Sequence, residues 1–349
     1  MTEWLMADSL WWDGRLRVGE ALRLGDGAAH PANLPSGATP RRMPGTLLPG
    51  LRDAHVHSAL VDLTLVRSGG IAAVWDLGGV PDQVAALAAR AGSALPRIRF
   101  AGPFLIQPGG YPSDRSWAPA GSWREVRSAA DAVEAVDELQ TIGATLVKVT
   151  ANASGPLLPA PTFRALVDAA HAAGLPVVVH AEGPGTVAAA HEAGADILAH
   201  TPWTETVDIG LTRACAGHMT WLSTLDIHGW GTPTPEQGTA IANLRRFHEY
   251  GGTVRYGTDL GNGPLPPGVN PREIRALQSA GLSPTEILTT MTQTPHKPSP
   301  PKPSPPAPSP PAPSPIQPCW IPGGLDLDPA SFADTVATAR VVDPSHHQG

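Results

Sequence analysis

Histidines end several strand-like apolar runs of this chain, and their positions predict a shared site. His55 and His57 are separated by one residue in RDAHVH, so the alternation of a strand points both imidazoles the same way. His180 ends VVVH and His200 ends DILAH, so both lie at the carboxyl end of a predicted strand. A single such histidine is more often an ordinary core residue. Four imidazoles at strand ends could instead converge as metal ligands over one site.

A carboxylate and an amine add to this set. Asp259 ends TVRYGTD, the last predicted strand, where a carboxylate can bind a hard cation and accept a proton from water. The alternative is a turn or helix-capping aspartate before Gly261. Lys148 lies among β-branched residues in TLVKVT, where a buried ammonium is costly, although its amine could also extend to the surface at the strand end. If metals are present, reaction of the amine with carbon dioxide would give an anionic carbamate able to bridge two cations.

The elements that must position these residues form a repeating pattern. From Thr46 onward, short apolar runs alternate with Ala-rich helical segments, which is typical of βα units and a parallel sheet. The eight predicted strands are residues 46–57, 71–77, 97–105, 145–150, 176–182, 196–201, 219–224 and 253–259. The span 46–294 is close to the roughly 250 residues of an eightfold barrel, so the predicted fold is a TIM-like (β/α)₈ barrel. Such barrels build their active sites at the carboxyl ends of the strands.

Several helices are expected between and after these strands. The clearest are residues 128–142, 160–173 and 235–250, each followed by a glycine suited to a helix end. Helices at 270–281 and 284–291 should close the barrel, the second with Ser283 as N-cap and Glu286 at its third position.

Four segments are expected along the chain. Residues 1–46 hold short apolar stretches between glycine turns and predict the first part of a small accessory β layer. Residues 47–294 are the barrel. Residues 295–318 are a Pro-, Ser- and Ala-rich tract that predicts solvated polyproline II structure. Residues 319–349 regain apolar character and could return to the β layer.

The order of the candidate ligands resembles a known family. HxH on the first strand, Lys on the fourth, His on the fifth, His on the sixth and Asp on the eighth resembles the binuclear-metal branch of the amidohydrolase superfamily. Within it, the chain is similar to imidazolonepropionase-related amidohydrolases, and GPFLIQPGGYP after the third strand is a further similarity. Residues 46–294 carry the resemblance. The chain departs from the family pattern near its end, where the Pro-rich tract replaces part of a segment that usually returns to the β layer.

This resemblance implies a two-metal hydrolytic centre with six protein ligands: His55, His57, Lys148, His180, His200 and Asp259. The first-strand pair and the aspartate would hold one ion, and the other two histidines would hold the second. Carboxylated Lys148 and a hydroxide would bridge the ions, with Asp259 as the general base. The implied cofactors are two divalent metal ions and carbon dioxide as the carbamate. Zinc suits these ligands, and manganese, iron and cobalt remain options.

Residues for substrate contacts are expected in two long irregular segments, 106–125 and 224–234, where loops of a barrel set specificity. The predicted substrate-binding residues are Tyr111, Trp117, Trp203 and His228. Further candidates are Arg115, Trp123 and Trp230. Packing within the loops or exposure to solvent is the alternative for each.

The predicted function is hydrolysis of a small-molecule amide by a metal-activated bridging hydroxide. The substrate would be a cyclic amide, an N-acyl compound or a dipeptide-like compound. The same centre would also support a lactonase, esterase or phosphotriesterase. A non-enzymatic alternative is an inactive barrel that binds partners through its Pro-rich segment.

Composition limits the partners. A net charge of −7, a pI near 6.0 and 24 Lys+Arg offer no basic surface for nucleic acid. No apolar run is long enough to span a membrane, and the N-terminal residues do not resemble a signal peptide. Cys215 and Cys319 are too few for a disulfide framework. We therefore expect a cytoplasmic protein with a small-molecule substrate, no nucleic-acid or membrane partner, and a homo-oligomer as an option.

Overall fold

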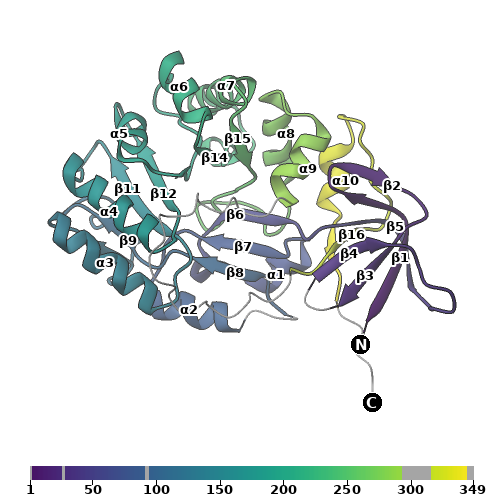
Figure 1. Cartoon of the computed structure of the whole chain (residues 1–349). Coiled ribbons are helices and arrows are strands. Elements are labelled where there is room, and N and C mark those ends of the chain that lie inside the picture. The colour runs from purple at the N-terminus through teal and green to yellow at the C-terminus, as the bar shows by residue number, and fades with distance from the viewer. Residues whose placement is uncertain (1, 26–27, 91–93, 293–315, 344–349) are drawn as a thin grey trace.

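The computed structural model describes residues 2–25, 28–90, 94–292 and 316–343. A small β-sheet stands beside a larger unit of parallel strands whose outer side carries helices (Figure 1). Only residues 316–318 of the Pro-rich tract are described, so the prediction of polyproline II structure falls outside the described residues.

The small sheet takes strands from both ends of the chain. Its strands are β1 (Glu3–Trp12), β2 (Arg15–Arg17), β3 (Ala21–Gly25), β4 (Ala28–Ala32), β5 (Arg41–Leu48), β16 (Cys319–Ile321) and β17 (Arg340–Val341). Their order is β17-β16-β5-β1-β3-β4, with β2 paired to β1. Leu5, Leu10, Leu22 and Leu47 are fully buried in the core of this sheet. In Figure 1, yellow β16 lies alongside the purple N-terminal strands.

The prediction of one continuous strand at 46–57 is wrong. Strand β5 ends at Leu48 in the small sheet, and β6 (Arg52–Val56) begins the parallel strands. Pro49 has no N–H to continue the ladder. Gly50 packs so tightly that an added Cβ would lie 2.3 Å from the carbonyl oxygen of Gln317. The chain therefore changes sheets at this Pro-Gly pair.

The other strands follow the predicted alternation with helices. They are β7 (Ala73–Asp76), β8 (Arg97–Phe100), β9 (Phe104–Ile106), β10 (Trp123–Glu125), β11 (Val147–Asn152), β12 (Val177–Glu182), β13 (Ile197–Leu198), β14 (Thr220–Leu222) and β15 (Thr253–Arg255). All pair in parallel, as β6-β7-β8 and as β10-β9-β11-β12-β13-β14-β15. The predicted third strand is divided into β8 and β9, and β10 is a strand that the sequence did not predict. A parallel α/β fold is confirmed.

Backbone hydrogen bonds join both edges of the three-stranded sheet to the longer sheet. The amide of Thr145 donates to the carbonyl of Phe100 over 2.9 Å, beside the start of β11. At the other edge, the amide of Ala54 donates to the carbonyl of Tyr256 over 3.0 Å, and that of His57 to Leu260 over 2.8 Å. The sheets themselves are two ladders rather than one continuous one.

The helices of the parallel unit are α1 (Leu63–Ser68), α2 (Pro81–Ala89), α3 (Ala129–Thr141), α4 (Ala160–Ala172), α5 (Thr186–Ala193), α6 (Ile209–Ala216), α7 (Pro235–Glu249), α8 (Pro271–Ser279) and α9 (Pro284–Thr292). Helix α10 (Phe332–Ala337) packs beside α8 (Figure 1). Short 3-10 helices η1 (Ser58–Leu60) and η2 (Asp226–His228) follow β6 and β14. No helix among the described residues is long and apolar enough to cross a bilayer.

Local sequence signals account for the helix ends. The predicted capping box at α9 is confirmed, because the Ser283 amide donates to Glu286 Oε2 over 2.8 Å and the Glu286 amide to Ser283 Oγ over 3.4 Å. The helices predicted at 128–142, 160–173 and 235–250 are confirmed as α3, α4 and α7, with ends shifted by about one residue.

The inner face of the parallel strands leads toward the candidate ligands. Leu146 and Val178 belong to a buried apolar cluster inside this unit. Lys148 and His180 come two residues later on β11 and β12, so they continue the same face toward the carboxyl ends.

Candidate metal centre

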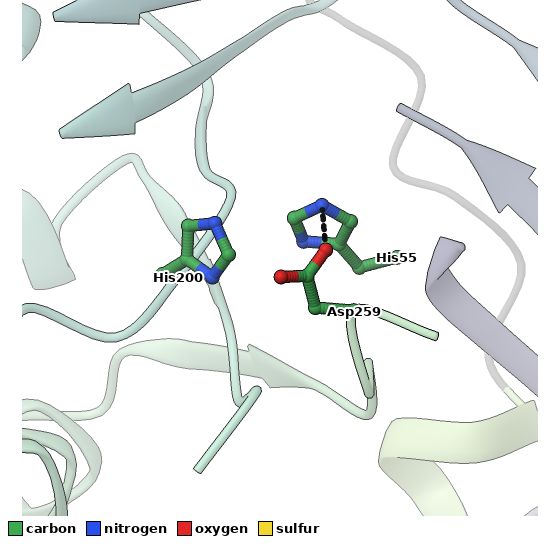
Figure 2. Close-up of side chains that lie close together, drawn as sticks. All are labelled: His55, His200 and Asp259. Carbon is green, nitrogen blue, oxygen red and sulfur yellow. Dashed lines mark ion pairs between the residues drawn. The ribbon is translucent and has the colours of Figure 1, made fainter. Parts of the chain in front are cut away.

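His55, His200 and Asp259 form the centre of the site. One potential ligand atom from each lies within 4.8 Å of the others, and all three residues are buried. Figure 2 shows the Asp259 carboxylate between the two imidazoles. The residues come from three chain segments: β6, the end of β13 and the loop after β15.

Backbone carbonyls decide which nitrogen of the first histidine pair faces the carboxylate. Nδ1 of His55 lies 2.8 Å from the carbonyl oxygen of Ala199, and Nδ1 of His57 lies 2.9 Å from that of Gly78. A carbonyl oxygen can only accept, so Nδ1 carries the proton in both rings. The Nε2 atoms are therefore turned to Asp259 Oδ1, at 3.0 Å from His55 and 3.2 Å from His57.

Asp259 presents an oxygen that lacks a hydrogen-bond donor. Its Oδ2 accepts from Nδ2 of Asn262 over 2.9 Å. Its Oδ1 is buried, and no donor of suitable geometry reaches it among the described residues. The backbone of Asp259 is left-handed, with φ 58°. Residues other than glycine rarely adopt this conformation, and those that do are frequently found at functional sites. A buried acceptor of this kind costs free energy unless a cation or proton compensates it.

Charges within the site keep the carboxylate ionised and one imidazole neutral. Burial favours the acid form of Asp259, but the neighbouring histidines outweigh it and hold the pKa of Asp259 well below its usual value. Burial lowers the pKa of His55 to about 4, so its ring is neutral at pH 7. Burial also favours neutral His57, but the adjacent Asp259 outweighs burial and raises the pKa of His57.

A residue that follows the neighbouring strand β14 orients the His200 ring. Its Nδ1 lies 3.0 Å from Oγ1 of Thr224, the residue at which the chain leaves β14. Thr224 is also left-handed, with φ 40°. Burial lowers the pKa of His200 well below its usual value, so this ring is neutral. Nε2 is then the nitrogen that remains to bind a ligand.

Lys148 and His180 lie on the same inner face but outside the three-residue group. The Lys148 side chain is 1% exposed, and burial lowers the pKa of its amine to about 7 against the opposing charges of Asp259 and Asp76. Nε2 of His180 lies 3.0 Å from Oε2 of Glu182, which also accepts from Nδ2 of Asn152 over 2.8 Å. The ring of His180 lies 5.0 Å from that of His200.

Sequence reasoning missed several residues that support the ligands. Thr224 and Glu182 touch His200 and His180, and both occur at the ends of predicted strands. Asp76 is fully buried at the end of β7 and accepts from the Ser58 amide over 2.7 Å. Its carboxylate influences the charge of His57 and Lys148. Their position at a strand end is the signal that could have identified them. A polar residue at the carboxyl end of any of the eight predicted strands is expected to lie at the same face as the ligands.

Two of the predicted substrate residues, Tyr111 and Trp203, form ring contacts with the candidate ligands, and His228 contacts one of these two. Tyr111 stacks on His180, with centroids 4.9 Å apart and planes at 20°. Trp203 lies 5.3 Å from His200 and 5.8 Å from His180, and it stacks on His228 at 4.8 Å.

Trp117 is one ring further out, 6.0 Å from Tyr111. The guanidinium of Arg115 lies 5.5 Å from the ring centroid of Tyr111, Trp123 belongs to β10, and Trp230 is exposed after η2.

Comparisons with known proteins place the fold. No protein-family model matches the sequence, and no curated protein sequence is significantly similar. Solved structures are similar. A prolidase complexed with N-methylphosphonate-L-proline has a TM-score of 0.69 and 20% identity over 98% of this chain and 97% of that one. Ochratoxinase from A. niger has a TM-score of 0.68 and 18% identity over 83% of this chain and 82% of its own.

A third similar structure is an amidohydrolase, with a TM-score of 0.64, 21% identity and coverage of 83% of this chain and 85% of that one. This chain shares the fold of these structures. Identities of this size establish shared architecture, whereas the chemistry must be argued from the site itself.

Proposed function

We propose that this protein is a metal-dependent amidohydrolase that cleaves the C–N bond of a small-molecule amide. The observation that carries the proposal is the buried Oδ1 of Asp259, which has no suitable donor and faces Nε2 of His55 and His57. Neutral imidazole nitrogen and carboxylate oxygen repel each other unless a cation or a proton lies between them.

The donor set fits a divalent transition metal. Two ligand atoms that each lie about 2.1 Å from a tetrahedral zinc ion are about 3.4 Å apart. The Asp259–His55 and Asp259–His57 contacts, at 3.0 and 3.2 Å, are close to that separation. Nδ1 of His55 and of His57 donates to the carbonyl oxygen of Ala199 or Gly78, and Nδ1 of His200 is hydrogen-bonded to the Thr224 hydroxyl. Such bonds on the far nitrogen are the usual outer support of metal-binding histidines.

We assign the ligand roles as follows. His55, His57 and Asp259 would hold one ion, and His180 and His200 would hold a second. Bound divalent cations would lower the pKa of a water molecule and polarise the amide carbonyl. His180 would have to exchange its contact with Glu182 for the metal, so a one-metal centre with His200 is the simpler form of the same proposal.

Lys148 would bridge the two ions as a carbamate. The neutral amine attacks the carbon of carbon dioxide, an N–C bond forms and one proton leaves to solvent. The burial of Lys148 supports this role, because an unpaired ammonium at that position is costly while an anion between two cations is compensated.

Asp259 would act as the general base. Its carboxylate would accept a proton as the water oxygen attacks the amide carbon, and the same proton would then pass to the leaving nitrogen as the C–N bond breaks. One water and one amide become a carboxylic acid and an amine, and Asp259 returns to its ionised form.

His228 would contact the substrate. Its Nε2 is buried and has no partner among the described residues, and burial lowers the pKa of the ring to about 4, so the ring is neutral. Its ring stacks on that of Trp203, which lies 5.3 Å from the ring of His200, and this contact supports the role. A neutral imidazole can donate to the amide carbonyl oxygen or accept from the amide nitrogen.

We also propose that β6 to β15 form one closed eightfold barrel. The bonds from Thr145 to Phe100 and from Ala54 to Tyr256 support closure, because each joins one edge of the three-stranded sheet to the longer sheet. Residues 1–48 and 319–349 would then form the accessory β domain, with residues 49–294 as the catalytic domain; the predicted boundary at residue 46 moves because β5 continues to Leu48 in the small sheet. A cytoplasmic location is supported by two buried, unpaired cysteines, Cys215 and Cys319.

Metal content is the decisive test. Protein purified without chelators would be analysed by plasma mass spectrometry, beside His55→Ala, Lys148→Ala and the control His30→Ala on β4. We expect about two equivalents of a transition metal in the wild type and the control, with loss in the first two variants. One equivalent that survives Lys148→Ala would support the mononuclear form, and no metal would overturn the proposal.

A substrate panel separates the amide reaction from related ones. Initial rates would be compared on cyclic amides, N-acyl amino acids, dipeptides, lactones and phosphotriesters. Preference for amides supports the assignment, while faster turnover of lactones or phosphotriesters would replace it.

A further inference from the structure

Exposed apolar side chains lie in loops that follow the parallel strands, at the end of the strands that carries the candidate ligands. Nine large apolar side chains are exposed among the described residues, and four of them lie in loops that follow parallel strands. These four are Leu60 at 53% exposure, Trp117 at 44%, Leu157 at 39% and Trp230 at 47%. We call this set the entrance cluster. Exposed apolar side chains gathered at one face mark a binding surface more often than scattered ones do.

The loops that carry the entrance cluster adjoin the ligands or one another. A Cβ added to Gly261, two residues after Asp259, would lie 3.3 Å from Cβ of Leu60. One added to Gly263 would lie 2.6 Å from the indole nitrogen of Trp230, so this indole covers the same loop. Leu60 and Trp230 therefore both border the loop that follows Asp259.

The opposite side of the entrance is built in the same way. A Cβ added to Gly110, next to Tyr111, would lie 3.0 Å from the carbonyl oxygen of Pro156. The backbone next to Leu157 therefore lies against the loop that carries Tyr111 and Trp117. The loops after β6, β9, β11, β14 and β15 all contribute to this surface.

A chain of aromatic rings connects the entrance cluster to the ligands. The Trp117 ring lies 6.1 Å from that of Phe104 and 6.0 Å from that of Tyr111. Phe104 in turn lies 5.9 Å from His57, and Tyr111 lies 4.9 Å from His180. An exposed indole is therefore one ring away from two different candidate ligands.

We propose that this surface is a substrate subsite for a bulky aromatic or hydrocarbon group attached to the scissile amide. This inference rests on the proposed function, because the proposed metal centre fixes where the scissile amide binds. The ring contacts favour an aromatic group as the bound part of the substrate. A planar group beside Trp117 would pack on the row of aromatic rings that leads to His57 and His180. Small amides such as acetyl compounds are too short to contact the entrance cluster, so the cluster stays hydrated and adds nothing to their binding affinity.

Binding can be tested without turnover by using sulfonamides, which lack a scissile carbonyl. Calorimetry would measure Kd for 2-naphthalenesulfonamide and methanesulfonamide, which differ in their aromatic group. We expect the naphthalene compound to bind at least about tenfold more tightly, and Trp117→Ala to weaken it by about 5- to 30-fold with little change for the methane compound. Leu157→Ala should weaken it less, by about 2- to 5-fold.

Matched controls lie on the small sheet. Leu16 on β2 is exposed like Leu157, and Trp4 on β1 is a tryptophan remote from the entrance. Leu16→Ala and Trp4→Ala should leave both Kd values unchanged. Equal Kd values for the two sulfonamides, or an unchanged Kd in Trp117→Ala, would overturn the subsite.

Two further outcomes are informative. Sedimentation velocity that finds a dimer abolished by Trp117→Ala, with no naphthalene binding to the dimer, would show that a second copy covers the surface and would overturn the proposal. Tight naphthalene binding that depends on Trp117, without hydrolysis of naphthoyl amides or of any amide in the substrate panel, would support an aromatic-binding site while refuting the amidohydrolase assignment.

Discussion

Thr224 positions His200 from a strained backbone. Its Oγ1 lies 3.0 Å from Nδ1 of the imidazole, and its φ of 40° places it in the left-handed region. Thr224 lies two residues after the end of β14, and its hydroxyl points to the His200 ring, which follows the neighbouring strand β13. Thr224 is thus a positioning residue, which would act on a bound metal only through His200.

The first prediction tests this contact. Thr224→Ala removes the hydroxyl and should lower metal affinity by about 10- to 100-fold, as is typical for loss of a hydrogen bond behind a metal ligand. Thr224→Ser keeps the hydroxyl and should retain affinity within about threefold. Competition with a chelator of known affinity measures both. Equal affinity of the Ala and Ser variants would remove the positioning role.

The second prediction concerns Asp259. Asp259→Asn keeps one oxygen ligand but removes the proton acceptor, so the rate of amide hydrolysis should fall by at least about 100-fold. Metal content should fall less than the rate. The control is Asp82→Asn, an exposed carboxylate on α2. A variant that hydrolyses the amide at the wild-type rate would require another base.

The third prediction concerns a buried carboxyl beneath the His228 loop. Glu273 on α8 accepts from the Leu225 amide over 3.0 Å and from the Asp226 amide over 2.7 Å, one with each oxygen. Glu273→Gln replaces one acceptor with an NH₂ group that faces an N–H, and should lower the free energy of unfolding by about 1–3 kcal/mol. Urea denaturation measures this change. Glu249→Gln, exposed on α7, should change it by less than about 0.5 kcal/mol.

The fourth prediction gives a pH dependence away from the metal centre. Nε2 of His171 on α4 lies 2.9 Å from Oδ2 of Asp196, and this hydrogen bond raises the pKa of His171 although partial burial opposes it. A raised folded-state pKa contributes stability that is complete below about pH 6.5 and is lost as pH rises through the folded value.

The pair is partly exposed, so its contribution should be below about 1 kcal/mol. The difference in unfolding free energy between wild type and His171→Gln should therefore shrink between about pH 6 and pH 8. A difference that stays constant or grows over this range would contradict the assignment.

Part of this architecture follows from local sequence. Strand alternation and the common carboxyl edge of parallel strands were sufficient to predict that His55, His200 and Asp259 lie together, because both are periodic properties of the chain itself. Helix ends were equally readable, since Ser283 and Glu286 satisfy each other's amides within one turn. The predicted strand 46–57 was wrong because the strand breaks at Pro49 and Gly50, and nothing local says which sheet each half joins.

Only the tertiary structure decided how the ligands are oriented. Nε2 of His55 and His57 faces Asp259 because Nδ1 of each ring meets the carbonyl oxygen of Ala199 or Gly78. Every residue has a carbonyl, so no side-chain pattern in the sequence can mark these two. The role proposed for the exposed Trp117 likewise depends on its contacts with Phe104 and Tyr111. Their rings contact two different candidate ligands only in the assembled fold. The chain alone thus determines which residues reach one end of the strands, and long-range packing determines which atoms meet there.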